Sequence, residues 1–349
     1  MTNENATSAV ISCPVPEQGL LITMAHGGGG RMMHRLIRDV FLDEGECSGL
    51  HDGVVLEAQS RRLAYTTDSF VVRPLVFPGG DIGKLAVCGT INDLAMCGAR
   101  PAALSAGFIV EEGFRIDTLT RIARSMRQTA SECGVRVVTG DTKVVERGHG
   151  DGVYINTSGI GWVPEGVNIG PSQVQVGDVI ILSGDLGRHG IALLAAREGL
   201  DFRVTIESDC APLHQPVMRM IDAGIELHCL RDLTRGGLAG ALVEIAEARQ
   251  LGIRIRESDI AVCEEVHAAC EVLGFDPLHI ANEGRFCAFV PPASAAKALQ
   301  ILRSHTVSAD AQIIGHVTQD STSFVVIHTT IGTERIVDMP SGEILPRIC

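Results

Sequence analysis

The stretch MRQTASECGVRVVTG, residues 126–140, combines the end of an amphipathic helix, a glycine stop and a strand, and it decides the fold that we expect. Upstream of it, Asp117 is a candidate N-cap, and apolar residues then recur at helical spacing. After the glycine stop, Val135–Thr139 favours a strand that ends at Asp141. The same order recurs in RGGLAGALVEIAEARQLGIRIRE, residues 235–257. This echo is weak, but it predicts two domains of similar α+β design.

The chain of 349 residues is too long for one average core and suggests two domains. We expect an α+β fold with mixed sheets and helices packed on one face, including a helix over residues 84–97. The expected parts are a loosely ordered lead-in at 1–20, an N-terminal domain at 21–168, a C-terminal domain at 169–335 and a mobile tail at 336–349. The last ten residues, PSGEILPRIC, contain two prolines and a glycine, which favours an extended tail over a packed element.

The composition argues against several classes of protein. A net charge of −13 disfavours a sequence-independent grip on nucleic acid, which needs basic surface. No run approaches the roughly 18–20 apolar residues needed to cross a bilayer, and the start lacks the pattern of a signal peptide. The eleven cysteines form no paired C-x-x-C clusters, so a reduced, cytoplasmic protein fits better than a disulfide framework or a structural zinc site.

Acidic and amide residues stand at predicted strand ends and helix starts. They are Asp68 in TTDSF, Asn92 and Asp93 in GTINDLAMCG, Asp141 in TGDTKVV and Asp232 in LRDLTRGG. Hard oxygen ligands of this kind suit Mg²⁺, which keeps several waters and bridges phosphates. Each acid taken singly is more often a turn or cap residue. Together they predict a nucleotide–metal site.

Two glycine-rich stretches precede predicted helices. In HGGGG, residues 26–30, the backbone N–H groups of Gly28 and Gly29 are candidates for contact with phosphates. The stretch is neither a Walker A loop nor a G-x-G-x-x-G motif, and a flexible loop explains it as well. LSGDLGRHG, residues 182–190, predicts a turn that leads into a helix, with His189 as a loop residue rather than a ligand.

Lys143 and Glu283 are the candidates for acid–base chemistry. Lys143 lies two residues past Asp141, so on an extended segment both side chains point to the same face. Glu283 lies in ANEGR, just before a strand that begins at Phe286. In isolation, a lysine or glutamate of this kind is usually only solvated surface.

The chain ends in Cys349, a thiol at the end of the predicted tail. Fully extended, residues 336–349 could span roughly 45 Å, so the thiol could visit a site in its own protein and also a partner. Pro346 narrows the conformations of the tail, while Arg347 and Ile348 offer a charged and an apolar handle for docking. A frayed terminus with an incidental cysteine is the simpler alternative.

Taken jointly, the motifs are specific. They are MAHGGGG, GTINDLAMCG, GDTKVV, NTSGIG, LSGDLGRHG, RDLTRGGL, NEGR and the terminal PRIC. From about Leu21 onward the chain resembles the hydrogenase-maturation carbamoyl dehydratases (the HypE family), within the superfamily of aminoimidazole ribonucleotide synthetases and selenophosphate synthetases. The PRIC ending separates this family from its superfamily relatives.

The resemblance implies a two-domain synthetase fold that forms a homodimer. It implies that a carbamoyltransferase of the HypF type loads a carboxamide onto Cys349, and that ATP then removes the elements of water to leave a thiocyanate. The cyano group would pass to iron on a scaffold complex of the HypC–HypD type, for the [NiFe] hydrogenase centre. Lys143 and Glu283 would share the proton transfers, in an order that the sequence leaves open.

The resemblance also carries over a ligand set. ATP would be bound by Gly28, Gly29, Asn92, Asp93, Thr139, Gly140, Asp141 and Asn156, and Mg²⁺ by Asp68, Asp93, Asp141 and Asp232. Two alternatives compete with this assignment. A superfamily enzyme acting on a free small molecule would share the metal site but would have no use for Cys349. A non-enzymatic carrier would use the thiol without any dependence on ATP.

Overall fold

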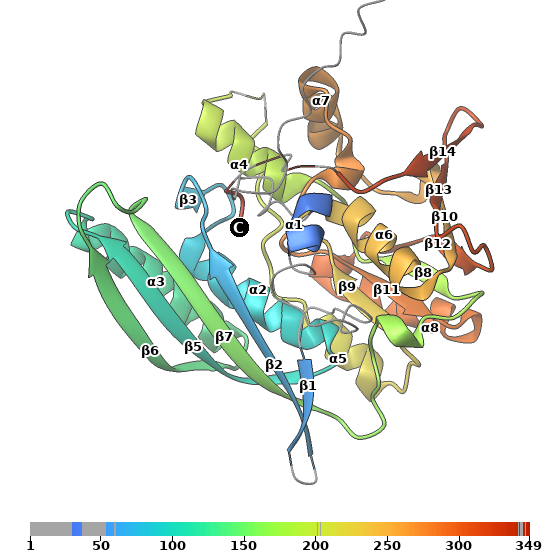
Figure 1. Ribbon diagram of the computed structural model, residues 1–349, viewed down its shortest axis with the longest axis horizontal. Helices are drawn as coiled ribbons and strands as arrows, with labels where there is room; N and C mark the ends of the chain where they lie inside the picture. Colours follow the sequence, from blue (N-terminus) through green and yellow to red (C-terminus); the bar gives the residue numbers. More distant parts are fainter. Residues whose placement is uncertain are drawn as a thin grey trace, which may run out of the picture.

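The computed structural model describes residues 30–36, 54–58, 61–200, 202, 204–340, 342, 345 and 347–349. Each half of the described chain is built on one sheet, and Figure 1 shows the two sheets on opposite sides of the molecule. Within the described residues, no helix is long and apolar enough to span a bilayer.

The first sheet has the strand order β1-β2-β7-β5-β6. Its strands are β1 (Val54–Ala58), β2 (Arg61–Phe70), β5 (Arg100–Glu111), β6 (Arg136–Val145) and β7 (Val153–Val163). The sheet is mixed, because β5 and β6 run parallel while the other neighbours run antiparallel. Buried and more exposed side chains alternate along β7, as expected when one face is covered and the other is open.

Two helices, α2 (Ile82–Met96) and α3 (Ile116–Glu132), cover the inner face of this sheet. The Asp81 carboxylate caps α2 by accepting hydrogen bonds from Gly83 N and Lys84 N. The predicted N-cap of α3 was wrong by two residues, because Arg115 occupies that position. Asp117 lies in the first turn and forms an ion pair with Arg115.

The second sheet has the strand order β14-β13-β10-β12-β8-β11-β9. Its strands are β8 (Val179–Leu182), β9 (Cys229–Asp232), β10 (Gly252–Arg256), β11 (Phe286–Val290), β12 (Gln312–Thr318), β13 (Val325–His328) and β14 (Glu334–Val337). Unlike the first sheet, it carries helices on both faces: α6 (Gly237–Arg249) packs on one, and α5 (His214–Asp222) and α8 (Pro292–Arg303) pack on the other. Every residue of β11 is buried, which is the pattern of a strand covered on both sides.

The remaining elements are short or peripheral. They are α1 (Arg31–Leu36), α4 (Arg188–Glu198), α7 (Glu264–Leu273), the hairpin of β3 (Val76–Phe77) and β4 (Gly80–Asp81), and 3-10 helices at Pro171–Gln173, Glu257–Asp259, Pro277–His279 and Thr306–Ser308.

The end of the chain is packed against the protein, contrary to the expectation of an unpacked tail. The described residues Leu345 and Ile348 are buried, and they join a hydrophobic cluster that contains Phe70 of the first sheet and Ile191 of α4. Figure 1 shows the C-terminus inside the outline of the molecule, near β3 and α4. This cluster holds the tail between the two halves.

Candidate functional site

Cys349 is held at the end of β2 by backbone hydrogen bonds. Val71 N donates to the backbone oxygen of Cys349 at 3.1 Å, and Arg73 N donates to Arg347 O at 3.1 Å. Arg197 also donates to Arg347 O, at 2.8 Å. The last residues therefore bind the segment after β2 through their backbone oxygens, and these contacts fix the position of the thiol.

The charges of groups from both halves act on the buried Cys349 thiol. Burial raises its pKa, the Arg235 guanidinium opposes that rise, and the carboxyl groups of Glu283, Asp68 and Asp232 add to it. Burial and the carboxyl groups together outweigh the single guanidinium in their effect on this pKa. The seated thiol is therefore a neutral S–H rather than a thiolate nucleophile at neutral pH.

Glu283 is the most perturbed acid of this group. Its side chain is buried, its Oε1 has no hydrogen-bond partner in the described structure, and burial raises its pKa well above the ordinary value. The charges of Cys210 and Asp232 raise this pKa further. Glu283 is thus a proton-holding group beside the thiol, and the prediction of a solvated surface residue as its alternative is wrong.

Backbone contacts fix the loop that carries Glu283. The Asn92 amide donates to Ala211 O at 3.1 Å and to Glu283 O at 3.4 Å, while its oxygen accepts from Leu213 N at 2.7 Å. The Asp209 carboxylate accepts from Glu283 N at 3.2 Å. Asn92 was predicted to bind nucleotide. In the structure its amide links the two halves, because it forms hydrogen bonds with the backbone of the segments that contain Ala211 and Glu283.

Asp68 and Asp93 lie between β2 and α2, on the inner face of the first sheet. Asp93 accepts a hydrogen bond from Thr66 Oγ1 at 2.7 Å. A side chain at Gly89, one helical turn before Asp93, would come within 2.9 Å of the Phe70 ring and would be in van der Waals contact with Asp68 Oδ2, at 3.5 Å. Burial raises the pKa of Asp68, and Arg235 lowers it.

Asp141, Lys143 and Asn156 lie on the opposite, outer face of the first sheet. They line a cavity of about 430 Å³ together with Ser69 and Val71, the residue that pairs with Cys349. Asn156 donates to Asp68 O at 2.9 Å, which ties this cavity to β2.

The neighbouring predicted residues follow the register of the same strands. Asp141 is in register with Asn156 across β5, and Thr139, two residues earlier, shares this face. Gly140 points to the other face, where a side chain would come within 2.3 Å of Ala106 O. Asp141 does not end the strand as predicted, since β6 continues to Val145.

Lys143 contacts Asp141 rather than the Cys349 site. The two form an ion pair of 3.1 Å, and both side chains are exposed, at 73% and 70%. The shared face that the sequence predicted for them is thus confirmed.

The four predicted metal ligands do not form one cluster. Asp68 and Asp232 border the thiol, Asp93 lies next to Thr66, and Asp141 occupies the outer face. Within the described chain, no three His, Cys, Asp or Glu side chains are arranged to hold a metal ion. The donor set nevertheless fits Mg²⁺ that is carried by phosphates, because such an ion needs only one or two carboxylates from the protein.

Sequence reasoning missed three residues of the site and could not test two others. Arg235 and His189 stand in the motifs RDLTRGGL and LSGDLGRHG, while Asp209 lies outside every motif, and nothing in their spacing indicated a role at the tail. Gly28 and Gly29 lie outside the described residues.

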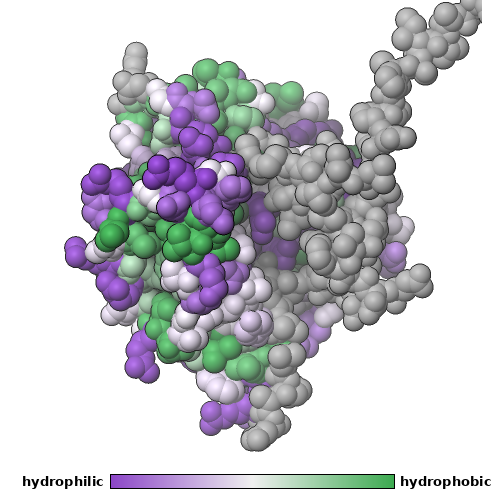
Figure 2. All heavy atoms as spheres, turned by 60° about the vertical axis from the view of Figure 1, so that its left-hand side comes forward, coloured by the Kyte–Doolittle hydropathy of each residue, from purple (hydrophilic) through white to green (hydrophobic). Residues whose placement is uncertain are grey.

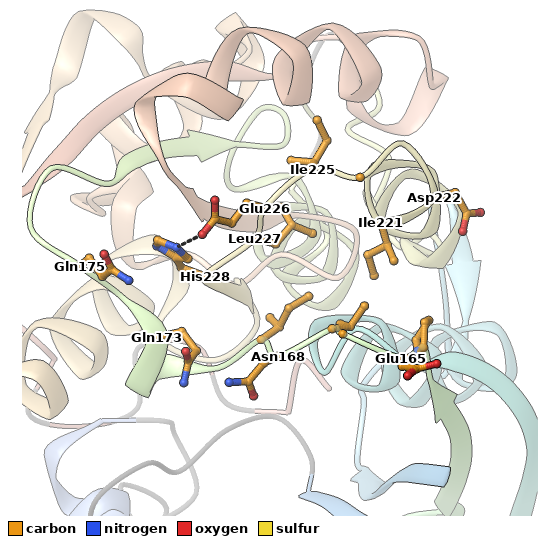
Figure 3. Close-up of a pocket in the computed structure, with 15 residues that line it drawn as sticks. Glu165, Asn168, Gln173, Gln175, Ile221, Asp222, Ile225, Glu226, Leu227 and His228 are labelled. Carbon is orange, nitrogen blue, oxygen red and sulfur yellow. Dashed lines mark hydrogen bonds and ion pairs between the residues drawn. The ribbon is translucent and has the colours of Figure 1, made fainter. Parts of the chain in front are cut away.

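A second cavity, of about 600 Å³, lies between the connection at residues 164–175 and the end of α5. Figure 3 shows its lining of polar and apolar side chains, in which His228 contacts Glu226. None of the predicted site residues lines it. The candidate site is therefore the region around Cys349 and the outer cavity next to it.

Comparisons with known proteins bear on this site. The family described as AIR synthase related protein matches through its N-terminal domain at residues 50–163 and its C-terminal domain at residues 175–328. Carbamoyl dehydratase HypE from Azotobacter vinelandii is 50% identical over 331 residues, which covers 94% of this chain and 97% of that protein. The chain belongs to the carbamoyl dehydratase HypE family. HypE from Escherichia coli K12 is 42% identical, over 94% of this chain and 99% of that protein.

Solved HypE structures share the fold. A HypE–HypF complex matches with a TM-score of 0.84 and 46% identity, covering 89% of this chain and 100% of that chain. A HypE structure in complex with ATP matches with a TM-score of 0.81 and 43% identity, covering 93% of this chain and 99% of that chain. The predicted family and the α+β fold class are thus confirmed.

Proposed function

We propose that this chain is an ATP-dependent carbamoyl dehydratase that acts in the cytoplasm on its own C-terminus. Its substrate is a carboxamide carried on the sulfur of Cys349, and its product is the thiocyanate, which supplies cyanide ligands for the iron of a [NiFe] hydrogenase. The observation that carries the proposal is the seat of Cys349, which Val71 N holds by its backbone oxygen and where the charges of four groups act on the thiol: Glu283, Asp68, Asp232 and Arg235. The HypE names and the ATP complex among its relatives support it.

The reaction removes the elements of water from S–C(=O)–NH₂. The carboxamide oxygen attacks the terminal phosphorus of ATP, both protons leave the nitrogen, and the C–O bond breaks as the C≡N bond forms. The oxygen departs as inorganic phosphate and ADP remains, so the water removed from the amide is accounted for by ATP hydrolysis. Because the thiol is only the carrier, the raised pKa of Cys349 is no obstacle.

Glu283 is the group that we propose to take a proton from the nitrogen. Burial raises its pKa, which makes its carboxylate a stronger base than that of an ordinary glutamate. Arg235, whose charge acts on Glu283, Asp68 and Cys349, favours the ionised carboxylate when the base is needed. Lys143 is the second candidate, and it would have to leave Asp141 to reach the carboxamide.

The nucleotide is assigned to the side of the sheet next to Val71. Asn156, Asp141 and Thr139 would contact it from the outer face, and Gly28 and Gly29 would contribute backbone N–H groups. Its phosphates would extend past Val71 to the Cys349 site, where Asp68 and Asp232 would hold a Mg²⁺ ion that offsets their charge.

The partners follow from the chemistry and from the open face of the first sheet. A carbamoyltransferase of the HypF type would load Cys349 when the tail leaves its seat, and an iron-carrying scaffold of the HypC–HypD type would collect the cyano group. We propose a homodimer in which a second copy covers the outer face of the first sheet, where Tyr65, Ile109, Val138 and Trp162 are exposed. Figure 2, which turns this side of the molecule forward, shows hydrophobic side chains exposed among hydrophilic ones.

The test couples ATP turnover to Cys349. ADP release is measured with the carbamoyltransferase and its substrates, for the natural chain, for Cys349→Ser and for Cys263→Ser as a matched control at a half-buried cysteine. We expect turnover in the natural chain and the control but none in Cys349→Ser. Turnover by Cys349→Ser on a free substrate would instead indicate a small-molecule synthetase, and transfer without ATP would indicate a carrier.

A further inference from the structure

His189 makes the most specific contact with the tail, although its sequence context predicted a loop residue. It is the second residue of α4 and is fully buried, with its ring edge-on to Phe77 at 5.5 Å between centroids. Its Nε2 lies 2.6 Å from Ile348 O, and its Nδ1 lies 2.7 Å from Ser208 Oγ. Both ring nitrogens are therefore used.

The protonation of this ring follows from its partners. A carbonyl oxygen only accepts, so Nε2 must carry the proton that bonds Ile348 O. Burial lowers the pKa of His189, so the ring is neutral and its Nδ1 accepts the Ser208 hydroxyl proton. The Ser208 oxygen in turn accepts from Cys210 N at 3.0 Å. The chain of hydrogen bonds fixes one tautomer, with its donor aimed at the tail.

Asp209 connects this contact to Glu283. One carboxylate oxygen of Asp209 accepts from His189 N at 3.1 Å, and the other accepts from Glu283 N at 3.2 Å and from Gly284 N at 2.9 Å. Gly284 permits this approach, because a side chain there would come within 2.0 Å of Asp209 O. A single carboxylate therefore sets the distance between the residue that contacts the tail and the residue beside the thiol.

We propose that His189 is a positioning residue that recognises the peptide carbonyl before Cys349, and that Asp209 keeps this contact aligned with Glu283. The proposal rests on the proposed function, since it assigns His189 the task of placing the carried carboxamide against the base. What is recognised is backbone: Ile348 O by His189, and Arg347 O by Arg197 and Arg73 N. The site thus selects a tail by its length and register.

The experiment compares two amides that each preserve one side of the ring. In His189→Gln the amide nitrogen can replace Nε2 as donor to Ile348 O, whereas in His189→Asn the shorter side chain can replace only Nδ1. Two rates are measured in the full-length chain. One is the alkylation of Cys349 by N-ethylmaleimide, followed on the C-terminal peptide without ATP, and the other is single-turnover loss of water from the carboxamide.

We expect His189→Asn to increase Cys349 alkylation about five- to tenfold, the effect of one lost hydrogen bond, and to slow dehydration by at least as much. His189→Gln should restore both rates toward those of the natural chain. Ser208→Ala keeps the imidazole but removes the hydroxyl that donates to His189 Nδ1. It serves as a further variant if His189→Gln and His189→Asn fold poorly, and it should also increase the alkylation of Cys349.

Equal alkylation rates in the Gln, Asn and natural chains would overturn the proposal, because His189 would then be an ordinary core residue. The proposal would also be overturned if alkylation were equally fast in His189→Asn and His189→Gln, because a loss of packing, and not the loss of the Nε2 donor, would then explain both rates. Absence of dehydration in every chain, including the natural one, would contradict the proposed function. The contact between His189 and the tail would still be tested, because the alkylation of Cys349 is measured without ATP.

Discussion

Truncation of the tail's apolar anchor should release Cys349 from its seat. The change is Ile348→Ala, at a side chain that is 7% exposed and packed with residues of both halves. The backbone hydrogen bonds from Val71 and His189 do not depend on this side chain, so they stay available. The variant therefore isolates the apolar part of tail docking.

The magnitude follows from the groups that are removed. Isoleucine loses three buried carbons on conversion to alanine, and at about 0.8 kcal/mol for each the seat is weakened by about 2 kcal/mol. Because 1.4 kcal/mol is a factor of ten, the fraction of chains with a free tail should rise about 30-fold. Burial raises the pKa of the seated thiol, so alkylation proceeds mainly through the free tail.

The assay is the alkylation rate of Cys349 by N-ethylmaleimide at neutral pH, measured by mass spectrometry of the C-terminal peptide. The matched control is Ile331→Ala, the same truncation at an isoleucine that is 84% exposed, and it should leave the rate unchanged. The buried Cys229 and Cys287 report on global unfolding and should stay unmodified. An unchanged Cys349 rate in Ile348→Ala, with folding intact, would refute docking through this anchor.

Three further predictions concern the site and the sheet. Glu283→Gln should slow dehydration about 10²–10⁴-fold. Burial raises the pKa of Glu283 in the folded chain, so the unfolded chain ionises first and the natural chain loses stability as pH rises above the unfolded pKa. The melting temperature of the variant should therefore gain on that of the natural chain from acidic to neutral pH, and no such gain would contradict the burial argument. Asp68→Asn should raise the Mg²⁺ concentration needed for half-maximal turnover about 10–100-fold, whereas Asp117→Asn, at an exposed acid, should not, and equal titrations would remove Asp68 from the metal site. Ile109→Glu should give a monomer in sedimentation velocity while Ile331→Glu does not, and a dimer that survives Ile109→Glu would exclude the outer face as the interface.

The sequence predicted the elements better than their contacts. The strand over residues 153–163 and the helix–strand echo are as expected, because apolar periodicity is local information. The strand that was expected to end at Asp141 instead runs to Val145, since its extension depends on pairing with β5. Helices were expected on one face of each sheet, but the second sheet carries helices on both faces. This arrangement depends on packing between segments that are distant in the sequence.

The site divides in the same way. Glu283 and Cys349 were found from motifs, and the structure adds that the thiol borders the carboxyl. The roles of Asn92 and His189 could not be found, because both act through backbone groups more than one hundred residues away. Every residue has a backbone carbonyl, so the sequence does not indicate which one a distant side chain will contact. The packing of the C-terminal tail was not predicted, because two prolines and a glycine are equally compatible with an extended segment that is free and with one that is docked.

The most direct test of the central claim is the mass of the C-terminal peptide. The natural chain is incubated with the carbamoyltransferase, its substrates and ATP, then digested, and the peptide that ends in Cys349 is followed over time. The account predicts a carboxamide increment on Cys349, followed by loss of one water in step with ATP hydrolysis. An increment on any other residue, or loss of water without ATP, would contradict it.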